Sequence, residues 1–429
     1  MNIDSDNSSS AAVPRSKIFY GYIVVAAAAL VLFIFSSNLF IFGIFFKPLV
    51  NEFGWSRALT SGASSLAWVV RGALGIVMGS LNDRLGPRLV ATGCGIMMGA
   101  GYLLMSQVNS IWQFYLFYVG IIGIGSSIYV PMVSTVARWF TGRRGLMTGL
   151  VVAGGGLGAL VSPPVADLLI TTYDWRISYV IFGCAALVII VVAAQFLRRD
   201  PEQKGLIPYG EIRRNEGELD SGRRGLNLKG AVCARQFWLL TWVLFCIGFC
   251  AHTIAVHIVP HATDMGISSA NAAIILALVG GMPIVGRIVH GTIADRIGYK
   301  RGIMIGISIV SVCLLWLIFA GETWMLYAFA VVFGLSWCVG MLSSPLTAEL
   351  FGLKSHGVIM GLTTVSYSAG AAVGPYISGY IFDATGSYQI AFTLSTVIAV
   401  SGVAITALIT PTEYNEQQKS LIDSQIGPY

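Results

Sequence analysis

Two aspartate–arginine pairs, Asp83-Arg84 and Asp295-Arg296, lie 212 residues apart (295 − 83), and each follows a long apolar stretch. The same offset relates several other positions: Gly145 with Gly357, Gly149 with Gly361, Leu150 with Leu362, and Pro163 with Pro375. Chance does not readily produce one offset at so many separate places, so the chain is an internal duplication. In a chain this apolar, duplication is typical of membrane transporters built from two similar halves.

Composition places most of the surface in lipid. Hydrophobic residues make up 55% of the sequence and charged residues 11%, whereas ordinary soluble domains contain about 25% charged residues. A helix needs roughly 20 apolar residues to cross a hydrocarbon core of about 30 Å, and strands of membrane barrels are shorter and alternate in polarity. The sequence therefore predicts twelve transmembrane helices, at residues 19–46, 57–82, 89–109, 111–136, 144–171, 175–197, 236–260, 270–294, 301–320, 323–347, 356–381 and 388–410.

These windows predict an all-α membrane protein with two pseudo-symmetric six-helix halves, at 19–197 and 236–410. We expect polar tails at 1–18 and 411–429, and a linker at 198–235 that holds nine of the 26 Lys and Arg residues. With both termini in the cytoplasm, 21 basic residues lie inside (26 − 3 − 2), two lie within helices, and three lie outside: Lys47, Arg57 and Arg176. This asymmetry follows the positive-inside rule. We expect a multi-pass protein of the bacterial cytoplasmic (inner) membrane.

Several other classes of protein are disfavoured. The net charge of +6 is spread over loops between spans, which argues against a nucleic-acid partner. Cys246 and Cys250 stand one helical turn apart, but no nearby His or acidic residue completes a metal site, so they are interpreted as packing residues. The chain contains no HExxH, GxSxG or phosphate-loop motif. We expect no enzyme activity, no cofactor and no metal, and a chain that functions as a monomer in the lipid bilayer.

The duplicated loops resemble the signature of the major facilitator superfamily between its second and third helices, repeated between the eighth and ninth. Gly86 and Gly298 permit tight turns. The resemblance implies that charged residues at these helix ends gate one face of the carrier through an ionic latch. The alternative is a static surface salt bridge, worth about 0–1 kcal/mol. The gating candidates are Asp83, Arg84, Asp295, Arg296 and Arg138.

Other segments resemble bacterial monocarboxylate transporters and oxalate:formate antiporters within that superfamily. The run from Phe45 to Leu49, followed by Glu52 to Arg57, is similar to their first external loop. Further similarities lie at residues 137–140, 143–146, 154–158 and 257–264. The resemblance implies a carrier of small organic anions.

Arg287 matches the position of an arginine that binds substrate carboxylate in those families. It lies eight residues before Asp295 (295 − 287), about 12 Å inside the membrane at 1.5 Å per residue. A lone guanidinium near the midplane is costly unless it faces a polar cavity or an anion, and its fork of donors suits a carboxylate. The alternative is a structural arginine that donates to backbone carbonyls.

Arg71 is the second intramembrane arginine, about 18 Å before the end marked by Asp83. Its repeat counterpart is Pro283 (71 + 212), one turn from Arg287. Both arginines could therefore approach one cavity from opposite halves, where two cations would suit a dicarboxylate. The alternative is an arginine held in helix packing, and the sequence leaves both open.

Three charged groups of those relatives are missing here. The residues at the corresponding positions are Pro283, Phe40 and Gly370. The proton-coupling candidate is then His290, three residues from Arg287 on the same helical face, although an interior histidine is more often a packing residue. His252 and His257 are weaker candidates. For the rest of the substrate site we expect Asn38, Tyr118, Tyr129, Trp337 and Tyr367.

The resulting hypothesis is a secondary active transporter of a small organic anion, a lactate-like monocarboxylate in symport with protons, working by alternating access. Two alternatives stay open. One is an antiporter that exchanges oxalate or dicarboxylates for a counter-transported anion. The other, from a different class, is a membrane sensor that transports nothing.

Overall fold

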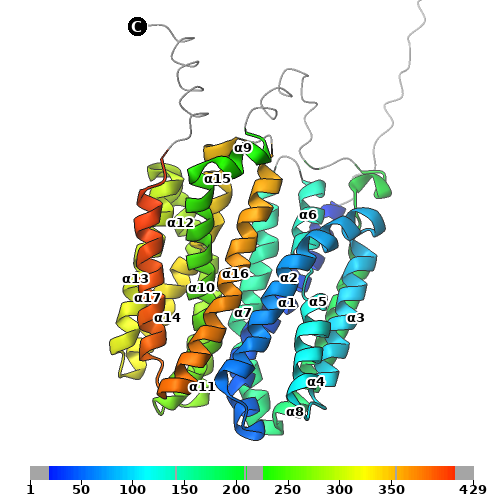
Figure 1. Ribbon diagram of the computed structural model, residues 1–429. Coiled ribbons are helices and arrows are strands. Elements are labelled where there is room, and N and C mark those ends of the chain that lie inside the picture. The colour runs from blue at the N-terminus through cyan, green and yellow to red at the C-terminus, as the bar shows by residue number, and fades with distance from the viewer. Residues whose placement is uncertain (1–18, 141–142, 207–208, 210–225, 353–354, 411–429) are drawn as a thin grey trace, which may run out of the picture.

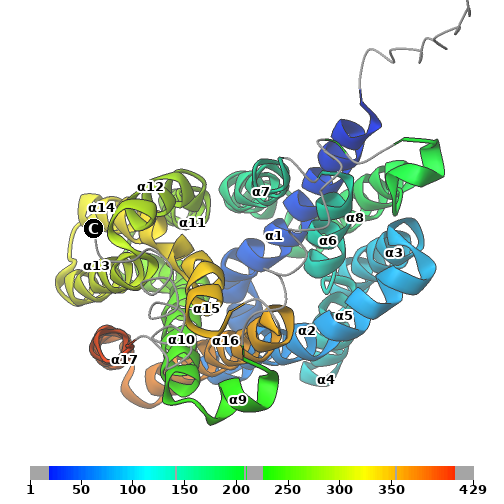
Figure 2. The same cartoon turned by 90° about the horizontal axis from the view of Figure 1, so that it is seen from above.

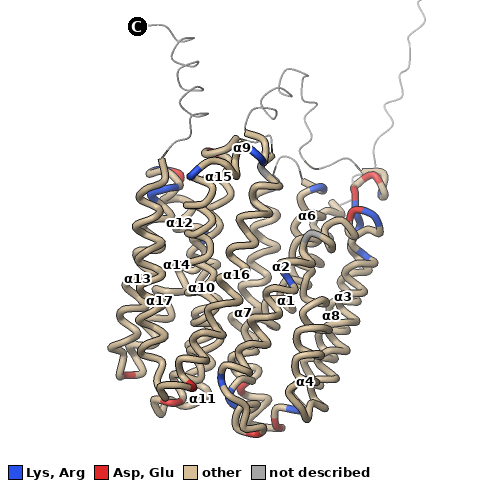
Figure 3. The backbone as a smooth tube through the Cα atoms, viewed as in Figure 1, with Lys and Arg blue, Asp and Glu red and all other residues tan. Residues whose placement is uncertain are grey.

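The computed structural model describes residues 19–140, 143–206, 209, 226–352 and 355–410, without the side chains of Ile76, Arg144 and His356. Almost all of this part of the chain is helical. Eleven described helices are long and apolar enough to span a membrane, and α2, which bends by 45° between Gly75 and Val77, makes up to twelve. Figure 1 shows the helices standing roughly parallel, and Figure 3 shows charged residues gathered at the two ends of the bundle.

The first group of spans comprises α1 Tyr20–Phe53, α2 Arg57–Leu85, α3 Pro87–Met105, a broken span (α4 Ile111–Tyr115, the π-helix η1 Leu116–Ile122, α5 Gly123–Gly125 and α6 Tyr129–Trp139), α7 Arg144–Tyr173 and α8 Trp175–Phe196. The second group comprises α10 Arg235–Asp264, α11 Ser269–Gly281 with α12 Pro283–Ile297, α13 Tyr299–Phe319, a broken span (α14 Thr323–Trp337, the 3-10 helix η5 Cys338–Leu342 and α15 Ser343–Phe351), α16 His356–Thr385 and α17 Gln389–Ala407. Between them lie η2 Pro201–Lys204 and α9 Leu228–Cys233.

The first helix is longer than its apolar window predicts. α1 continues through Pro48 to Phe53 and ends at Gly54, whose φ of 65° takes the left-handed conformation that closes many helices. The segment expected to form an external loop from Phe45 onward is therefore helical as far as Phe53. The reason is local, because Pro48 removes one backbone donor but the next residues up to Gly54 can all continue the helix.

The duplication is visible in the backbone. Of the eight described residues with positive φ, six form pairs separated by 212 positions (266 − 54, 298 − 86 and 386 − 174): Gly54 with Gly266, Gly86 with Gly298, and Asp174 with Gly386. Helix starts follow the same offset, as in Arg57 and Ser269 (269 − 57). The two halves thus turn at equivalent places.

Glycines allow neighbouring helices to touch backbone to backbone. A Cβ added to Gly158 of α7 would lie 2.1 Å from the carbonyl oxygen of Phe33 on α1, and one added to Gly248 of α10 would lie 2.2 Å from that of Tyr367 on α16. Small residues at such crossings are a common basis of helix association in membranes. Figure 2 shows the two helix pairs side by side, α7 with α1 in one half and α10 with α16 in the other.

The two halves touch each other mainly away from the end that carries the chain termini. We call that end, where α1 begins and α17 ends, the terminal face, and the end where α1 meets α2 the opposite face (Figure 1). Helix α2 packs on α16, α7 on α11, and α1 on α10. At the terminal face, by contrast, Cβ atoms built on Gly145, Gly149, Gly357 and Gly361 would meet nothing within 4 Å.

Candidate functional site

A cavity of about 490 Å³ lies along α6 and α7. Its wall begins at Tyr129, the first residue of α6 at the centre of the bundle, and reaches Gly145 in the first turn of α7 at the terminal face. The cavity therefore runs from the middle of the protein to the terminal face. Its lining residues are Tyr129, Val130, Val133, Ser134, Ala137, Gly145 and Thr148.

Arg287 lies on α12, the half-helix that begins at Pro283 after the break at Met282. Its side chain is partly exposed, and its charge acts on the hydroxyl of Tyr129, which lines the cavity, and on the thiol of Cys338. Within the described residues, the structure records no ion pair or hydrogen bond of its guanidinium with the protein. Arg287 thus presents a cation without a recorded partner near Tyr129 of the cavity wall, and its contact with a substrate stays a prediction.

Arg71 has a different environment. It is buried on α2, with 7% of its surface exposed, and its Nε donates to Ser126 Oγ at 2.8 Å. The charge of Arg71 also acts on the Tyr118 side chain, and the guanidinium carbon lies 5.2 Å from the centre of the Trp68 ring. Its buried Nη2 has no partner. Arg71 is thus held by packing and also retains a free donor, so the geometry contains elements of both interpretations.

His252 of α10 lies between the two halves near Arg71. Its Nε2 is 3.1 Å from Tyr367 Oη, and its ring centroid is 4.2 Å from that of Trp68 and 5.7 Å from that of Trp337. Arg71 acts on it electrostatically. Of the expected site residues, the structure brings Arg71, Tyr367 and Trp337 close to a histidine that the sequence analysis ranked below His290.

His290 does not share the surroundings of Arg287. Its side chain is buried, with Nδ1 3.1 Å from the carbonyl oxygen of Gly286 one turn earlier. Its ring packs toward Gly306 of α13. Residues three apart share a broad helical face, but here the His290 side chain is buried in the packing of its own half, whereas that of Arg287 is partly exposed. The role of His290 in proton coupling stays a prediction.

Asn38 also lies apart from the cavity lining. It is fully buried on α1, where its Oδ1 accepts from Tyr102 Oη at 2.7 Å and its Nδ2 has no partner.

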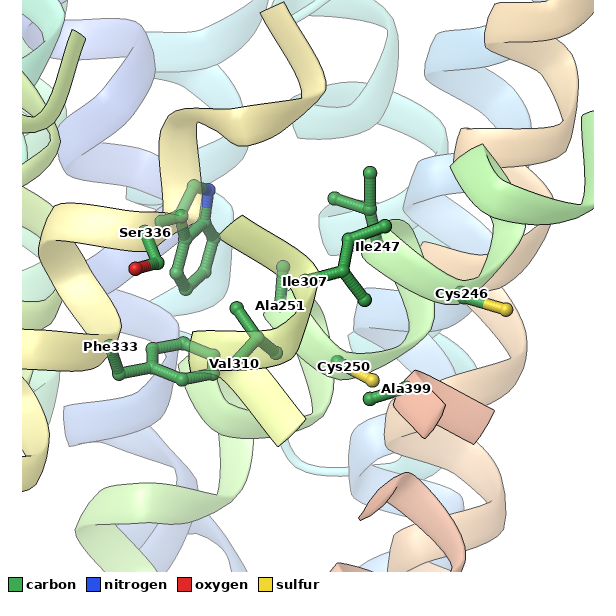
Figure 4. Close-up of a pocket in the computed structure, with 10 residues that line it drawn as sticks. Cys246, Ile247, Cys250, Ala251, Ile307, Val310, Phe333, Ser336 and Ala399 are labelled. Atoms are coloured by element: carbon green, nitrogen blue, oxygen red, sulfur yellow. The ribbon is translucent and has the colours of Figure 1, made fainter. Parts of the chain in front are cut away.

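A small void in the second half is unsuited to an organic anion, because its volume is about 10 Å³, comparable to one water molecule (Figure 4). The residues around it are mostly apolar: Cys246, Ile247, Cys250, Ala251, Ile307, Val310, Phe333, Ser336, Trp337 and Ala399.

The gating candidates differ between the halves. Arg138 of α6 pairs with Asp83 at the end of α2, and its Nη1 lies 3.6 Å from Asp200 in the segment after α8. The counterpart of Arg138 is Leu350 (138 + 212), and Asp295 accepts instead from Tyr299 Oη at 3.4 Å. Arg84 and Arg296 are exposed. Arg138 thus links α6 to α2 through Asp83, and to the segment after α8 through Asp200.

A second polar network, which the sequence analysis did not predict, closes the opposite face. Asp264 at the end of α10 accepts from Lys47 at 3.0 Å and from Arg57 at 2.7 Å. The carboxylate of Asp383 on α16 accepts from the backbone N–H groups of Arg57 and Ala58 at 2.8 and 2.7 Å. We call Lys47, Arg57, Asp264 and Asp383 the opposite-face network. It joins the halves across the face that is furthest from the termini.

A signal for part of this network was present in the sequence. Asp264 is the repeat counterpart of Glu52 (264 − 212), so both halves place an acid at the end of their first helix. Glu52 pairs with Arg176 at 2.8 Å inside the first half, whereas Asp264 reaches across to the other half. The duplication shows that the two acids correspond, but partner choice depends on tertiary packing.

Two groups of membrane-spanning helices, joined at one face, with a cavity that opens along α6 and α7 toward the other face, define a polytopic membrane transporter. Comparison with known proteins agrees. The sequence model of the Major Facilitator Superfamily matches residues 28–344 and 254–425. The chain belongs to this superfamily.

Individual relatives are distant. Monocarboxylate transporter 11 of Homo sapiens is 28% identical over 404 residues, covering 89% of this chain and 81% of that protein. Monocarboxylate transporter 13 of Rattus norvegicus is 27% identical over 401 residues, covering 90% and 89%. A solved structure of a bacterial homolog of the human lysosomal transporter Spinster, inward-facing and unoccupied, is similar with a TM-score of 0.72 and 14% identity, over 91% of this chain and 97% of that one. This last likeness concerns the fold.

Proposed function

We propose that this protein is a secondary active transporter of small organic anions, that its substrate is a lactate-like monocarboxylate, and that it moves with protons by alternating access. The observation that carries the proposal is the unpaired guanidinium of Arg287 beside a cavity open to one face. A guanidinium binds a carboxylate through two parallel hydrogen bonds, and in a low-dielectric site that pairing offsets the cost of burying the charge. The similarity to monocarboxylate transporters supports the same class of substrate.

We further propose that the terminal face is cytoplasmic, because 21 of the 26 basic residues belong to segments on that side (26 − 3 − 2). The halves at 19–197 and 236–410, joined by the linker at 198–235, would then rock about the cavity in a bacterial inner membrane. The arrangement of the helices, closed at the opposite face and separated at the terminal face, corresponds to an inward-facing state.

Uptake by purified protein in proteoliposomes tests the proposal. Radiolabelled lactate should accumulate when the outside is acidified, because an inward proton gradient drives symport, and a protonophore should abolish the accumulation. Accumulation that requires a preloaded anion and ignores the proton gradient would favour the antiporter. Binding without movement of any carboxylate would favour the sensor.

The antiporter is retained as a second candidate because of one observation. The buried Nη2 of Arg71 has no partner, so a second positive donor is available in the middle of the bundle. A dianion such as oxalate or succinate could use both arginines, whereas a monocarboxylate needs one.

A further inference from the structure

The opposite-face network divides its charges by half. Both cations, Lys47 of α1 and Arg57 of α2, belong to the first half, and both acids, Asp264 of α10 and Asp383 of α16, belong to the second half. Neither half contributes both a cation and an acid to the network. Movement of the halves away from each other therefore separates positive from negative charge.

Every recorded contact between the guanidinium of Arg57 and another side chain comes from the second half. Its Nη2 donates to Asp264 at 2.7 Å, its Nη1 donates to Tyr388 Oη at 2.8 Å, and its carbon lies 3.7 Å from the centre of the Phe382 ring. Lys47 likewise donates to Thr263 Oγ1 and to Asp264, each at 3.0 Å. Opening the opposite face removes these partners from both cations at once.

The first half already holds carboxylates in this state. Asp264 occupies the space between Lys47 and Arg57, and Asp383 occupies the N-terminus of α2 with two backbone donors. These side chains show that the first half, at this face, presents donors arranged for carboxylate groups. When the second half withdraws, the same donors meet solution.

We propose that Lys47 and Arg57 form an entry site for the carboxylate of the substrate when the opposite face is open, and that Asp264 displaces this anion when the face closes. The inference rests on the proposed function. Asp264 then has two roles. Its carboxylate closes the face, and it competes with the incoming anion for the same two cations. A cationic pair at the mouth of a cleft also raises the local concentration of anions at low ionic strength.

The internal repeat supplies a matched control. Glu52 is the counterpart of Asp264 (264 − 212), and its partner Arg176 lies at the same face, but both belong to the first half. Their pairing does not depend on the distance between the halves. Glu52→Gln therefore removes an equivalent carboxylate at this face without releasing a cation between the halves.

The test is lactate transport in proteoliposomes of known orientation, with KM measured separately from each face at low and high salt. Lys47→Gln and Arg57→Gln should each raise KM from the opposite face by about fivefold at low salt, and leave KM from the terminal face unchanged. Asp264→Asn should not raise KM from the opposite face, because both cations remain and their competitor is gone. Glu52→Gln should behave as wild type, and high salt should reduce the effects of the cation variants.

An equal rise of KM in Asp264→Asn and Lys47→Gln would overturn the proposal, because both variants would then act only by breaking the closed network. If the wild-type protein transports lactate, this result rejects the entry site alone, because the protein would still be a carrier of carboxylates. Wild-type protein that transports no carboxylate would overturn both. Lys47→Arg, which keeps the cation, should have the wild-type KM. Testing the charge at Lys47 is cleaner than testing it at Arg57, because replacing Arg57 also removes its contacts with Tyr388 and Phe382.

Discussion

Two arginines of the same kind, both near the middle of the bundle, have different surroundings. The guanidinium of Arg287 lies beside the cavity without a recorded partner among the described residues, whereas Arg71 is buried against Ser126, Tyr118 and Trp68. An arginine that is already bonded contributes to packing, and an unpaired one is available to a ligand. The sequence predicts that both lie inside the membrane, but not which of them has partners, because the partner Ser126 comes from a different span.

Replacement of Arg287 by lysine tests its role directly. Lysine keeps the positive charge but loses the planar fork that binds two carboxylate oxygens. We expect Arg287→Lys to lower kcat/KM for lactate by at least about tenfold, with normal amounts of folded protein in the membrane. Uptake assays with the purified variant measure this, and uptake equal to wild type would remove Arg287 from the substrate site.

Arg71→Gln separates binding from packing at the other arginine. If Nη2 of Arg71 contacts the substrate, the variant should weaken binding of oxalate and succinate more than that of lactate, because a dianion uses the second cation. Loss of packing alone should lower thermal stability and leave the order of the three Kd values unchanged. Because Arg71 is already held by its hydrogen bond to Ser126 and by the Trp68 ring, we expect the order to be unchanged, and calorimetric Kd values measure it.

At the scale of the helices, the two halves are similar but not equivalent. The duplicated Asp-Arg loops predict two matching latches, yet among the described residues Asp83 has a recorded arginine partner and Asp295 has none, and Leu350 stands at the position that corresponds to Arg138. The sequence already contained that difference, because the 212-residue offset places Leu350 at the position that corresponds to Arg138. The contact of Arg138 with Asp200 could not be predicted, because it depends on how the chain after α8 returns to the bundle.

Asp83→Asn and Asp295→Asn form a matched pair. Removing the charge at Asp83 breaks its pairing with Arg138 and should loosen α2 from α6, so the balance between inward-open and outward-open states should shift. Asp295→Asn should have a smaller effect, because its recorded partner is the neutral Tyr299. Labelling of engineered cysteines from each face measures the shift. Equal shifts in the two variants would contradict the asymmetry.

Contact between α1 and α7 offers a second prediction at this scale. Gly158→Val places a branched side chain where even a Cβ would lie 2.1 Å from the Phe33 carbonyl oxygen. Overpacking of this kind costs about 1–3 kcal/mol or more, so we expect a clear fall in the Tm of the detergent-solubilised protein. Gly149→Val on the same helix meets nothing within 4 Å and should change the Tm little. Similar Tm losses in the two variants would show that valine acts through helix propensity instead.

For the molecule as a whole, the architecture was predictable and the relation between the halves was not. Apolar windows predicted twelve spans, and their starts agree closely with those observed, as at Arg57, Ile111 and Arg144. Breaks inside spans, such as Ser126–Ile128 before α6, were not predicted, because two serines within an apolar window are also compatible with a continuous helix. The opposite-face network also escaped prediction, because Arg57 and Asp383 lie 326 residues apart and meet only in the folded protein.

A membrane voltage acts on charge within the hydrocarbon region by about 2.3 kcal/mol per elementary charge per 100 mV. Arg71 and Arg287 place two positive charges there, and in the described part of the chain neither has an acidic partner. In the proposed cycle, the empty carrier changes conformation while both arginine charges lie in the membrane field. A bound monocarboxylate neutralises one of these two charges. We expect potassium-diffusion potentials set with valinomycin to alter net uptake more than lactate–lactate exchange. The same response in both modes would show that these arginines stay fixed in the field, so the cell would pay no electrical cost for returning an empty carrier.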